Sequence, residues 1–318
     1  METVSPGKEI MSDTFSLRIT TEGPSRRSYG PVRRALGWIV VAAAAAAAVI
    51  VPLTGAPAAA QSIALLGVAL ALVQGTRRYG WGLLLAFFAI SYVISFAWEN
   101  LSVMTGFPFG NYHYTLTPQL FYVPVIIGVA YFGIGFVSWM TANTVLDRAD
   151  EHLNLRTRPG RINVFALPVL AGAVMTMFDV GIDSISSTVR GAWVWEEGGG
   201  VFGVPFTNYL GWWFVTWSFF QVFALVLATR QTRHPERTSD GLPRISHLQP
   251  VLIYMMFGIS SISAFLGFTE GDTVVDATGA AWSTPAIFEA LMIFNIFSII
   301  PVSLFAITKI ARGDLNRA

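Results

Sequence analysis

Five acidic side chains in this sequence have positions that would suit proton transfer within an apolar protein. They are Glu99, Asp179, Asp183, Glu196 and Glu289. Asp179 and Asp183 are four residues apart in "MTMFDVGIDSIS", so a helix would place them on one face. Two ionised carboxylates at this spacing would repel each other, and one is expected to keep its proton at neutral pH. A packing role, with the pair hydrogen-bonded to neighbouring helices, is the alternative.

A repeated motif provides aromatic and amide side chains that could surround such acids. The pattern W-E-x6-G-x-P-F-x-N-Y occurs at residues 98–112 and again at residues 195–209. An aromatic belt at the membrane surface would explain the rings, but it would not require the same Trp-Glu and Asn-Tyr spacing twice. We therefore expect the two copies to form paired walls of one pocket, whose π faces could stabilise a cation. The predicted pocket residues are Trp98, Phe109, Asn111, Tyr112, Trp195, Phe206, Asn208, Tyr209, Trp212 and Trp213.

The composition indicates that membrane-spanning helices hold these residues. Hydrophobic residues make up 53% of the 318 residues and charged residues 12%, which is about half the charged share of a soluble domain. A spanning helix needs roughly 17 to 25 apolar residues. Stretches of this kind lie at residues 36–54, 58–75, 81–98, 120–146, 162–182, 209–229, 249–268 and 286–310. We predict an all-α, polytopic membrane bundle of about eight transmembrane helices.

The basic residues predict the orientation of this bundle. All Lys and Arg except Arg190 lie in the N-terminal tail, near the C-terminal end, or in connections at residues 76–80, 147–161 and 230–248. Eight spans place these segments on one side, which the positive-inside rule assigns to the cytoplasm. We expect both termini to be cytoplasmic, with a disordered tail at residues 1–35 and a transmembrane catalytic domain at residues 36–312 in the cell membrane. The long polar leader favours an uncleaved first span, although the small-residue sequence "APAAAQS" follows it.

The predicted helix directions suggest different roles for the acids. The third and fifth spans run outward, so Glu99, Asp179 and Asp183 lie near helix C-termini. The partial negative charge there favours the protonated form, which suits a proton donor. Glu289 follows Pro285 near the N-terminus of an inward-running helix, where the ionised form is favoured. It would suit a general base or a group that holds water.

Several other kinds of chemistry lack the residues that they need. Cysteine does not occur, so thiolate chemistry and disulfides are excluded. Only four His are present, and most lie in predicted cytoplasmic connections, so the histidine cluster of a membrane iron oxygenase is not available. Neither Lys lies in mid-membrane for a retinal Schiff base, and no phosphate loop or dinucleotide fingerprint occurs. We expect no metal, no cofactor and, at a net charge of +1, no nucleic-acid partner.

The remaining features favour acid-catalysed chemistry on a lipid-soluble alkene. A neutral carboxylic acid would protonate the double bond, and aromatic faces would stabilise the resulting tertiary cation. A water molecule held by a carboxylate would then capture the cation.

The chain resembles, in three segments, the membrane carotenoid biosynthesis proteins that include bisanhydrobacterioruberin hydratase and the gamma-carotene 1',2'-hydratases. The segments lie between about residues 80 and 310 and read "FAWENLSVMTGFPFGNYHY", "FDVGIDSISSTVRGAWVWEEGGGVFGVPFTNYLGWW" and "STPAIFEALMIFN". The resemblance implies a carbon–oxygen lyase that hydrates the terminal isopropylidene double bond of an acyclic carotenoid without a cofactor. It also implies an isoprenoid lipid substrate in the bilayer and other membrane enzymes of carotenoid biosynthesis as partners. Family members often carry Pro after the second aspartate of the fifth span, whereas this chain has "DSIS" at residues 183–186, which leaves the end of that helix open.

Two other functions stay open from the residues alone. Asp179-x3-Asp183 looks like half of the magnesium-diphosphate site of a membrane prenyltransferase, although such a site needs further acids and basic residues for the phosphates. A non-catalytic carotenoid carrier or transporter would use the same acids for packing or as a proton relay. Dependence on magnesium and a diphosphate donor, or movement of pigment without a hydroxylated product, would distinguish these functions from hydration.

Overall fold

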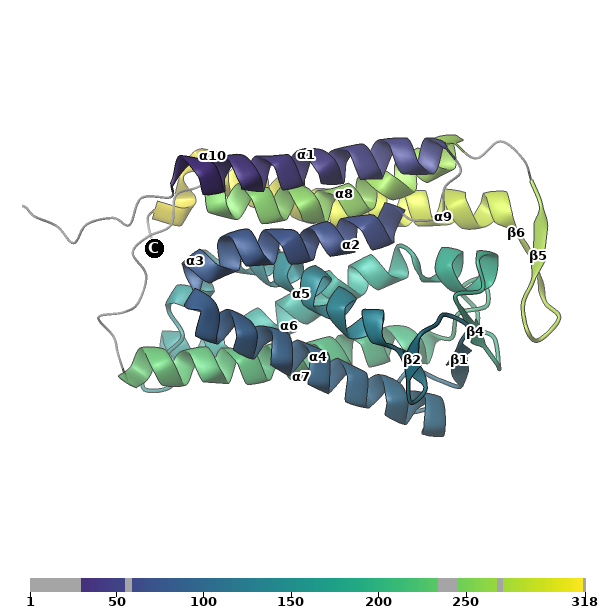
Figure 1. Cartoon of the computed structure of the whole chain (residues 1–318), viewed down its shortest axis with the longest axis horizontal. Coiled ribbons are helices and arrows are strands. Elements are labelled where there is room, and N and C mark those ends of the chain that lie inside the picture. The colour runs from purple at the N-terminus through teal and green to yellow at the C-terminus, as the bar shows by residue number, and fades with distance from the viewer. Residues whose placement is uncertain (1–29, 55–58, 234–244, 268–270, 317–318) are drawn as a thin grey trace, which may run out of the picture.

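The computed structural model describes residues 30–54, 59–233, 245–267 and 271–316 (Figure 1). These residues contain eight helices that are long and apolar enough to cross a membrane, which confirms the predicted all-α membrane bundle. Residues 1–29 of the predicted tail lie outside the described residues, and the first helix begins at Pro31. Proline suits this position because the first residues of a helix need no intrahelical partner for an N–H.

The spans are built from continuous and interrupted helices. The continuous ones are α1 (Pro31–Leu53), α4 (Gly80–Thr105), α5 (Val125–Val145), α7 (Phe206–Arg233) and α8 (Ile245–Gly267). The interrupted ones are α2 (Ala59–Leu70) with the π-helical η1 (Ala71–Gly75) and α3 (Thr76–Arg78), α6 (Arg158–Val180) with the π-helical η3 (Ile185–Val189), and α9 (Thr284–Phe297) with α10 (Ile299–Arg312). Two short 3-10 turns, η2 (Ala149–Glu151) and η5 (Asp314–Asn316), lie outside the spans.

Helix α5 forms the centre of the bundle. Every side chain from Tyr131 to Thr144 is buried, as expected for a helix that is apolar on all sides and has other helices around it. It packs against α2, α4, α6 and α8. The crossing with α2 brings backbone against backbone, because a Cβ added at Gly67 would lie 2.7 Å from the carbonyl oxygen of Gly133. Small residues permit this kind of close approach between membrane helices.

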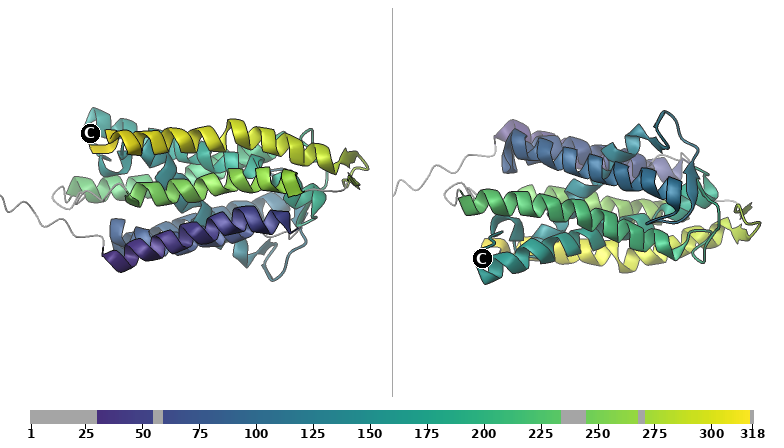
Figure 2. Two further views of the ribbon diagram at one scale, coloured as in Figure 1. Left: turned by 90° about the horizontal axis from the view of Figure 1, so that it is seen from above. Right: turned by 90° about the horizontal axis from the view of Figure 1, so that it is seen from below.

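The remaining helices form two groups around this centre. Figures 1 and 2 show α1, α8, α9 and α10 together on one side, with α4, α6 and α7 on the other. Helix α6 pairs along its length with α7, and α1 pairs with α8. The last predicted span, residues 286–310, is interrupted at Ser298. Pro301 explains the interruption, because its ring would clash with the carbonyl of Phe297 and it has no N–H to bond there.

Short strands gather at the end of the bundle away from the C-terminus, which we call the strand end (Figure 1). They are β1 (Tyr112–Tyr114), β2 (Gln119–Leu120), β3 (Val123–Pro124), β4 (Trp193–Trp195), β5 (Thr273–Val275) and β6 (Ala281–Ser283). Strands β1 and β4 pair antiparallel, with Tyr112 opposite Trp195 and Tyr114 opposite Trp193. This pairing joins the two copies of the repeated motif, which contact each other as predicted.

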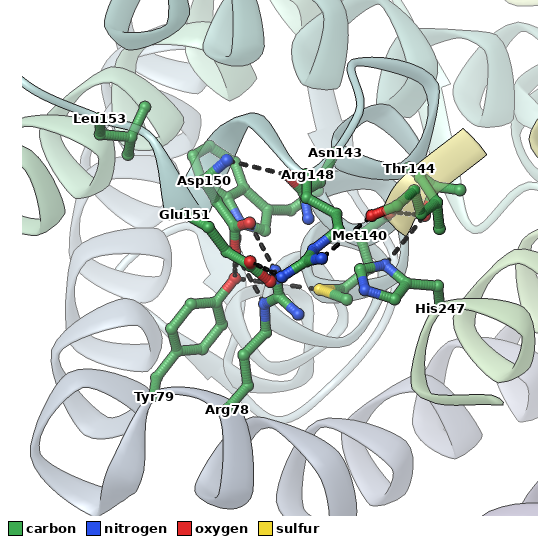
Figure 3. Close-up of polar contacts among 12 residues, drawn as sticks. Arg78, Tyr79, Met140, Asn143, Thr144, Arg148, Asp150, Glu151, Leu153 and His247 are labelled. Atoms are coloured by element: carbon green, nitrogen blue, oxygen red, sulfur yellow. Dashed lines mark hydrogen bonds and ion pairs between the residues drawn. The ribbon is translucent and has the colours of Figure 1, made fainter. Parts of the chain in front are cut away.

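A buried polar network closes the opposite end of the bundle (Figure 3). The guanidinium of Arg78 donates to both carboxyl oxygens of Asp150, at 2.7 and 2.5 Å, and the Tyr79 hydroxyl donates to the same carboxylate at 2.6 Å. Burial alone would raise the pKa of Asp150, but the charge and hydrogen bonds of Arg78 outweigh it and hold this pKa below its usual value. Arg148 pairs with Glu151 and donates to the carbonyl of Leu315 at 3.0 Å. The network therefore ties the start of α4 to η2 and to the C-terminal segment.

Candidate active site

Three of the five predicted acids converge on one cavity near the strand end. It has a volume of about 980 Å³ with its open mouth included, and residues from α2, α4, α5, α6, α7, β1 and β4 line it. Most of the lining is apolar. The polar exceptions include Glu99, Asp179 and Asp183, whose side chains are all at least 97% buried. A cavity that gathers three buried carboxyl groups in an apolar surrounding is the default candidate for a functional site.

Asp179 and Asp183 form a pair through a shared amide. The side-chain amide of Asn208, at the start of α7, donates to Oδ2 of Asp179 at 2.9 Å and to Oδ2 of Asp183 at 2.7 Å. The indole N–H of Trp193 also donates to Oδ1 of Asp183, at 2.8 Å. An amide has two hydrogens, so Asn208 can serve both carboxyl groups at once. The two aspartates therefore lie next to each other in the fold. Asn208, a predicted pocket residue, lies in the cavity lining and joins them.

A break in α6 positions this pair. The regular helix ends at Val180, and the chain resumes in the π-helical η3 after Asp183. The Asn295 amide donates to the hydroxyl of Ser261 at 2.7 Å, and that hydroxyl donates to the carbonyl of Gly181 at 3.3 Å. A Cβ at Gly181 would lie 2.6 Å from Oδ1 of Asn295. The sequence "DSIS" does not predict where this helix ends. In the structure it ends where polar side chains from α8 and α9 hydrogen-bond the backbone between the two aspartates.

Glu99 has a different environment from the aspartates. Three phenolic hydroxyls donate to its carboxylate, those of Tyr112, of Tyr114 at 3.0 Å and of Tyr131 at 2.7 Å. Burial raises the pKa of Tyr112 and Tyr114, and the charge of Glu99 raises it further. Both hydroxyls therefore remain protonated donors at neutral pH. These three hydrogen bonds offset part of the free-energy cost of burying the carboxyl group in an apolar cavity.

Tyr114 and Tyr131 contact Glu99 but are not among the residues that the sequence predicts for the site. Tyr114 could have been found, since it alternates with Tyr112 in "NYHY" and a strand places both side chains on one face. Tyr131 lies seven residues into α5, and only the packing of that helix against α4 brings its hydroxyl to Glu99. Its ring also stacks on Trp212, with centroids 4.8 Å apart and planes 12° apart.

Aromatic rings enclose the space beside the acids. The predicted pocket residues Phe109, Trp195 and Trp212 lie in the cavity lining, together with Trp193 and Phe178. The ring of Trp195 lies 4.8 Å from that of Tyr112 across the β1–β4 pair. Ring faces can stabilise a cation within about 6 Å by roughly 2 kcal/mol when water is excluded. The walls can therefore support positive charge without a basic residue.

The two motif copies contribute unequally to this cavity. Trp98 and Glu99 lie in helix α4, which directs Glu99 inward, whereas the matching Trp195 and Glu196 lie at the end of a strand. Successive strand residues point to opposite faces, so the buried ring of Trp195 leaves Glu196 exposed, where it lies 3.3 Å from His113. The amides are also unequal, because Asn111 donates to Glu197 at 2.6 Å and not to a cavity acid.

Seven predicted site residues lie outside the lining of this cavity. Glu289 is exposed on α9, and Trp98 packs against Phe107 and Phe214. Trp213 is 43% exposed, and its indole N–H donates to the carbonyl of Val169 at 3.2 Å. The full set is Trp98, Asn111, Glu196, Phe206, Tyr209, Trp213 and Glu289.

Comparison with known proteins gives one finding. A family model described as "Carotenoid biosynthesis protein" matches residues 59–271. No curated protein and no solved structure matches the chain. The matched segment runs from the start of α2 to the connection after α8, so it contains every helix and strand that lines the cavity.

Proposed function

Because the chain belongs to the carotenoid biosynthesis protein family, we propose that it is a hydratase of acyclic carotenoids in the cell membrane. It would add water to the terminal isopropylidene C=C of a bisanhydrobacterioruberin-type or gamma-carotene-type substrate with forty or fifty carbons and yield a tertiary alcohol. The observation that carries this proposal is the placement of the Asp179–Asp183 pair and the tyrosine-bound Glu99 around one aromatic-walled cavity.

The aspartate pair is the proton donor of the proposed reaction. Two carboxyl groups that share one amide donor in an apolar cavity are most stable with one proton between them. The side chain of Asp183 accepts hydrogen bonds from two described side chains, Trp193 and Asn208, whereas that of Asp179 accepts one, from Asn208. Asp183 accepts more side-chain hydrogen bonds, so it is the ionised member of the pair, and Asp179 holds the proton. Asp179 gives this proton to the CH carbon of the (CH3)2C=CH– end of the substrate. The π electrons of the double bond form the new C–H bond.

Proton transfer leaves a tertiary cation on the branched carbon. The rings of Trp193, Trp195 and Trp212 line the space in which this cation would form. In this scheme Glu99 is ionised, unlike the proton donor expected from its place near a helix C-terminus, and it contributes an opposite charge on the same cavity. Groups fixed by folding need no reorganisation as charge develops, and this makes them effective in an apolar site. Exclusion of other nucleophiles from such a site also limits side reactions of the cation.

Water capture completes the proposed reaction. A water molecule bound by Glu99 attacks the cation with an oxygen lone pair and forms the C–O bond. Glu99 accepts the proton that this water loses, and the proton returns through cavity water to the aspartate pair. The net change is substrate plus water to alcohol, and both acid groups recover their starting states. Glu196 and Glu289 have no part in this scheme, since both side chains are exposed away from the cavity.

The test is hydration in water labelled with oxygen-18. The protein is expressed in cells that accumulate acyclic carotenoids, and the pigments are examined by mass spectrometry. A hydratase gives a tertiary alcohol that carries the heavy oxygen at the chain end. A folded protein that leaves forty- and fifty-carbon substrates unchanged would refute the proposal and favour a pigment carrier. Product formation only with magnesium and an isoprenyl diphosphate would instead indicate a prenyltransferase.

A further inference from the structure

The cavity opens at its side, between α2 and α5. Its acids are buried, but other lining residues are well exposed, including Leu65 on α2 at 48% and Ile126 on α5 at 49%. Both residues lie within membrane-spanning helices. Exposed apolar residues in the outer turns of a spanning helix contact the hydrocarbon of the bilayer.

Buried rings cover the acids at the strand end. The rings of Phe109, Tyr112 and Trp195 are between 94% and 99% buried, and the β1–β4 pair holds two of them in register. Thr207 also donates to the carbonyl of Phe109 at 2.9 Å and ties the two motif copies together. Four described lining residues are exposed, of which Gln61, Leu65 and Ile126 lie on α2 and α5 and Leu116 lies in the loop after β1. Most of the exposed lining therefore belongs to the two spanning helices.

The side opening follows from small residues next to the α2–α5 crossing. Gly67 and Gly133 hold the two backbones in contact, and a Cβ at Gly133 would lie 2.3 Å from the carbonyl oxygen of Ala64. On the strand-end side of this contact, the lining includes Ala60 from α2 and Ala130 from α5. A methyl side chain on each helix leaves room that larger side chains would fill.

We infer that this opening, between Leu65 and Ile126, is the entrance for the end of an elongated apolar lipid that arrives from within the bilayer. The identity of the lipid as a carotenoid rests on the proposed function. A conjugated chain of forty or fifty carbons is rigid and apolar, so most of its length must stay against hydrocarbon while one end reacts. An entrance in the wall of the bundle allows this, and it places the reacting double bond beside the buried acids.

Photo-crosslinking tests the entrance without relying on turnover. A diazirine-bearing amino acid is placed at Leu65 or at Ile126 and, as matched controls, at Leu85 or Val93. The controls are 56% and 63% exposed on α4 and do not line the cavity. Membranes that contain acyclic carotenoid are irradiated, and peptide adducts are identified by mass spectrometry. We expect adducts at residues 65 and 126 at least tenfold above those at 85 and 93, and equal labelling at all four positions would overturn the inference.

A steric variant provides a second measurement. Ala130→Phe narrows the entrance, whereas Ala97→Phe adds the same ring to an exposed position on α4. We expect Ala130→Phe to reduce both carotenoid crosslinking at residue 65 and hydration at least tenfold, and Ala97→Phe to leave both near the wild-type level. Crosslinking at the entrance without hydration would retain the entrance and reject the hydratase. Hydration without positional preference in crosslinking would retain the hydratase and reject the entrance.

Discussion

Replacement of Asp179 by Asn is the most informative perturbation of the proposed mechanism. The new amide keeps the size of the carboxyl group, and its oxygen can still accept the 2.9 Å hydrogen bond from Asn208. Asp183 keeps its donors Trp193 and Asn208. Folding should therefore be preserved while the proposed proton donor is lost. General acid catalysis contributes about 10²- to 10⁴-fold, so hydration should slow by that factor, or about 3 to 5 kcal/mol in activation free energy.

The double variant distinguishes a proton-sharing pair from two independent acids. Asp183→Asn removes the carboxylate that keeps the proton on Asp179, so it should cause a loss similar to that of Asp179→Asn. Residues that act as a unit are strongly non-additive. The combined variant should therefore be no more than about tenfold slower than either single variant.

The assay for this series is oxygen-18 incorporation per folded protein, measured at saturating carotenoid in isolated membranes. Asp272→Asn is the control, because Asp272 is exposed at the strand end and makes no contribution to the cavity. Full activity of Asp179→Asn would remove that residue from the mechanism. Losses that multiply in the double variant would refute the shared proton.

Four further predictions test the other parts of the structure. Glu99→Gln should slow hydration about 10²-fold or more, because it removes the proposed carboxylate base to which three tyrosine hydroxyls donate. Carotenoid crosslinking at residue 65 should not change. Turnover at the wild-type rate would exclude Glu99 as the base. Asn295→Ala should lower kcat with little change in KM, because it removes hydrogen bonds that hold the Gly181 backbone between the aspartates, and Asn295 does not line the cavity. An unchanged kcat would show that these hydrogen bonds do not position the pair. Asp150→Asn should destabilise the detergent-solubilised protein by roughly 1.5 to 3 kcal/mol, because it leaves Glu151, at 3.1 Å, as the remaining acidic partner described for the buried Arg78. The pKa of Asp150 in the folded protein lies below its unfolded value of about 3.9. The stability that this carboxylate contributes is therefore complete above about pH 3.9 and is lost as the pH falls through the folded pKa. A thermal unfolding temperature that does not change with pH over this acidic range would contradict the prediction. A tertiary ammonium with an isoprenoid tail should inhibit about 10²-fold more strongly than the tertiary alcohol of the same skeleton, as expected for a mimic of the cation, and equal inhibition would mean that the cavity does not favour positive charge.

The spans and the aspartate pair could be predicted because both depend on local sequence. Apolar length defines a spanning helix, and a spacing of four residues predicts that Asp179 and Asp183 lie close together. The regular helix ends between them, however, and Asn208 joins the two carboxyl groups. The same local reasoning also gave Asn208 and Trp195 as pocket residues. The break at Gly181 is different, since Asn295 and Ser261 come from other helices and reach the backbone only in the packed bundle.

The environment of each acid required the packed structure. The sequence treats Glu99 and Glu196 as equivalent members of a repeat, but one lies in a helix and the other follows a strand, so their side chains point to different surroundings. Tyr131 reaches Glu99 only because α5 packs against α4. The position of Glu289 near the start of a helix does not turn its side chain toward the cavity.

The charge of the cavity connects the site to the reaction. Three carboxyl groups line it, and the residues that make up its described lining include no Lys, Arg or His. Carboxylates in such a position are costly unless they are protonated or hydrogen-bonded. The proton shared by the aspartates and the three tyrosine hydroxyls on Glu99 reduce this cost in the resting protein, but neither supplies a positive charge. In the proposed reaction, a cation at the end of the apolar substrate supplies a positive charge for the lifetime of the intermediate. Attraction that is stronger at the transition state than in the ground state accelerates a reaction. Under the proposed mechanism, the acid cluster would therefore favour the step that creates a cation from a neutral lipid.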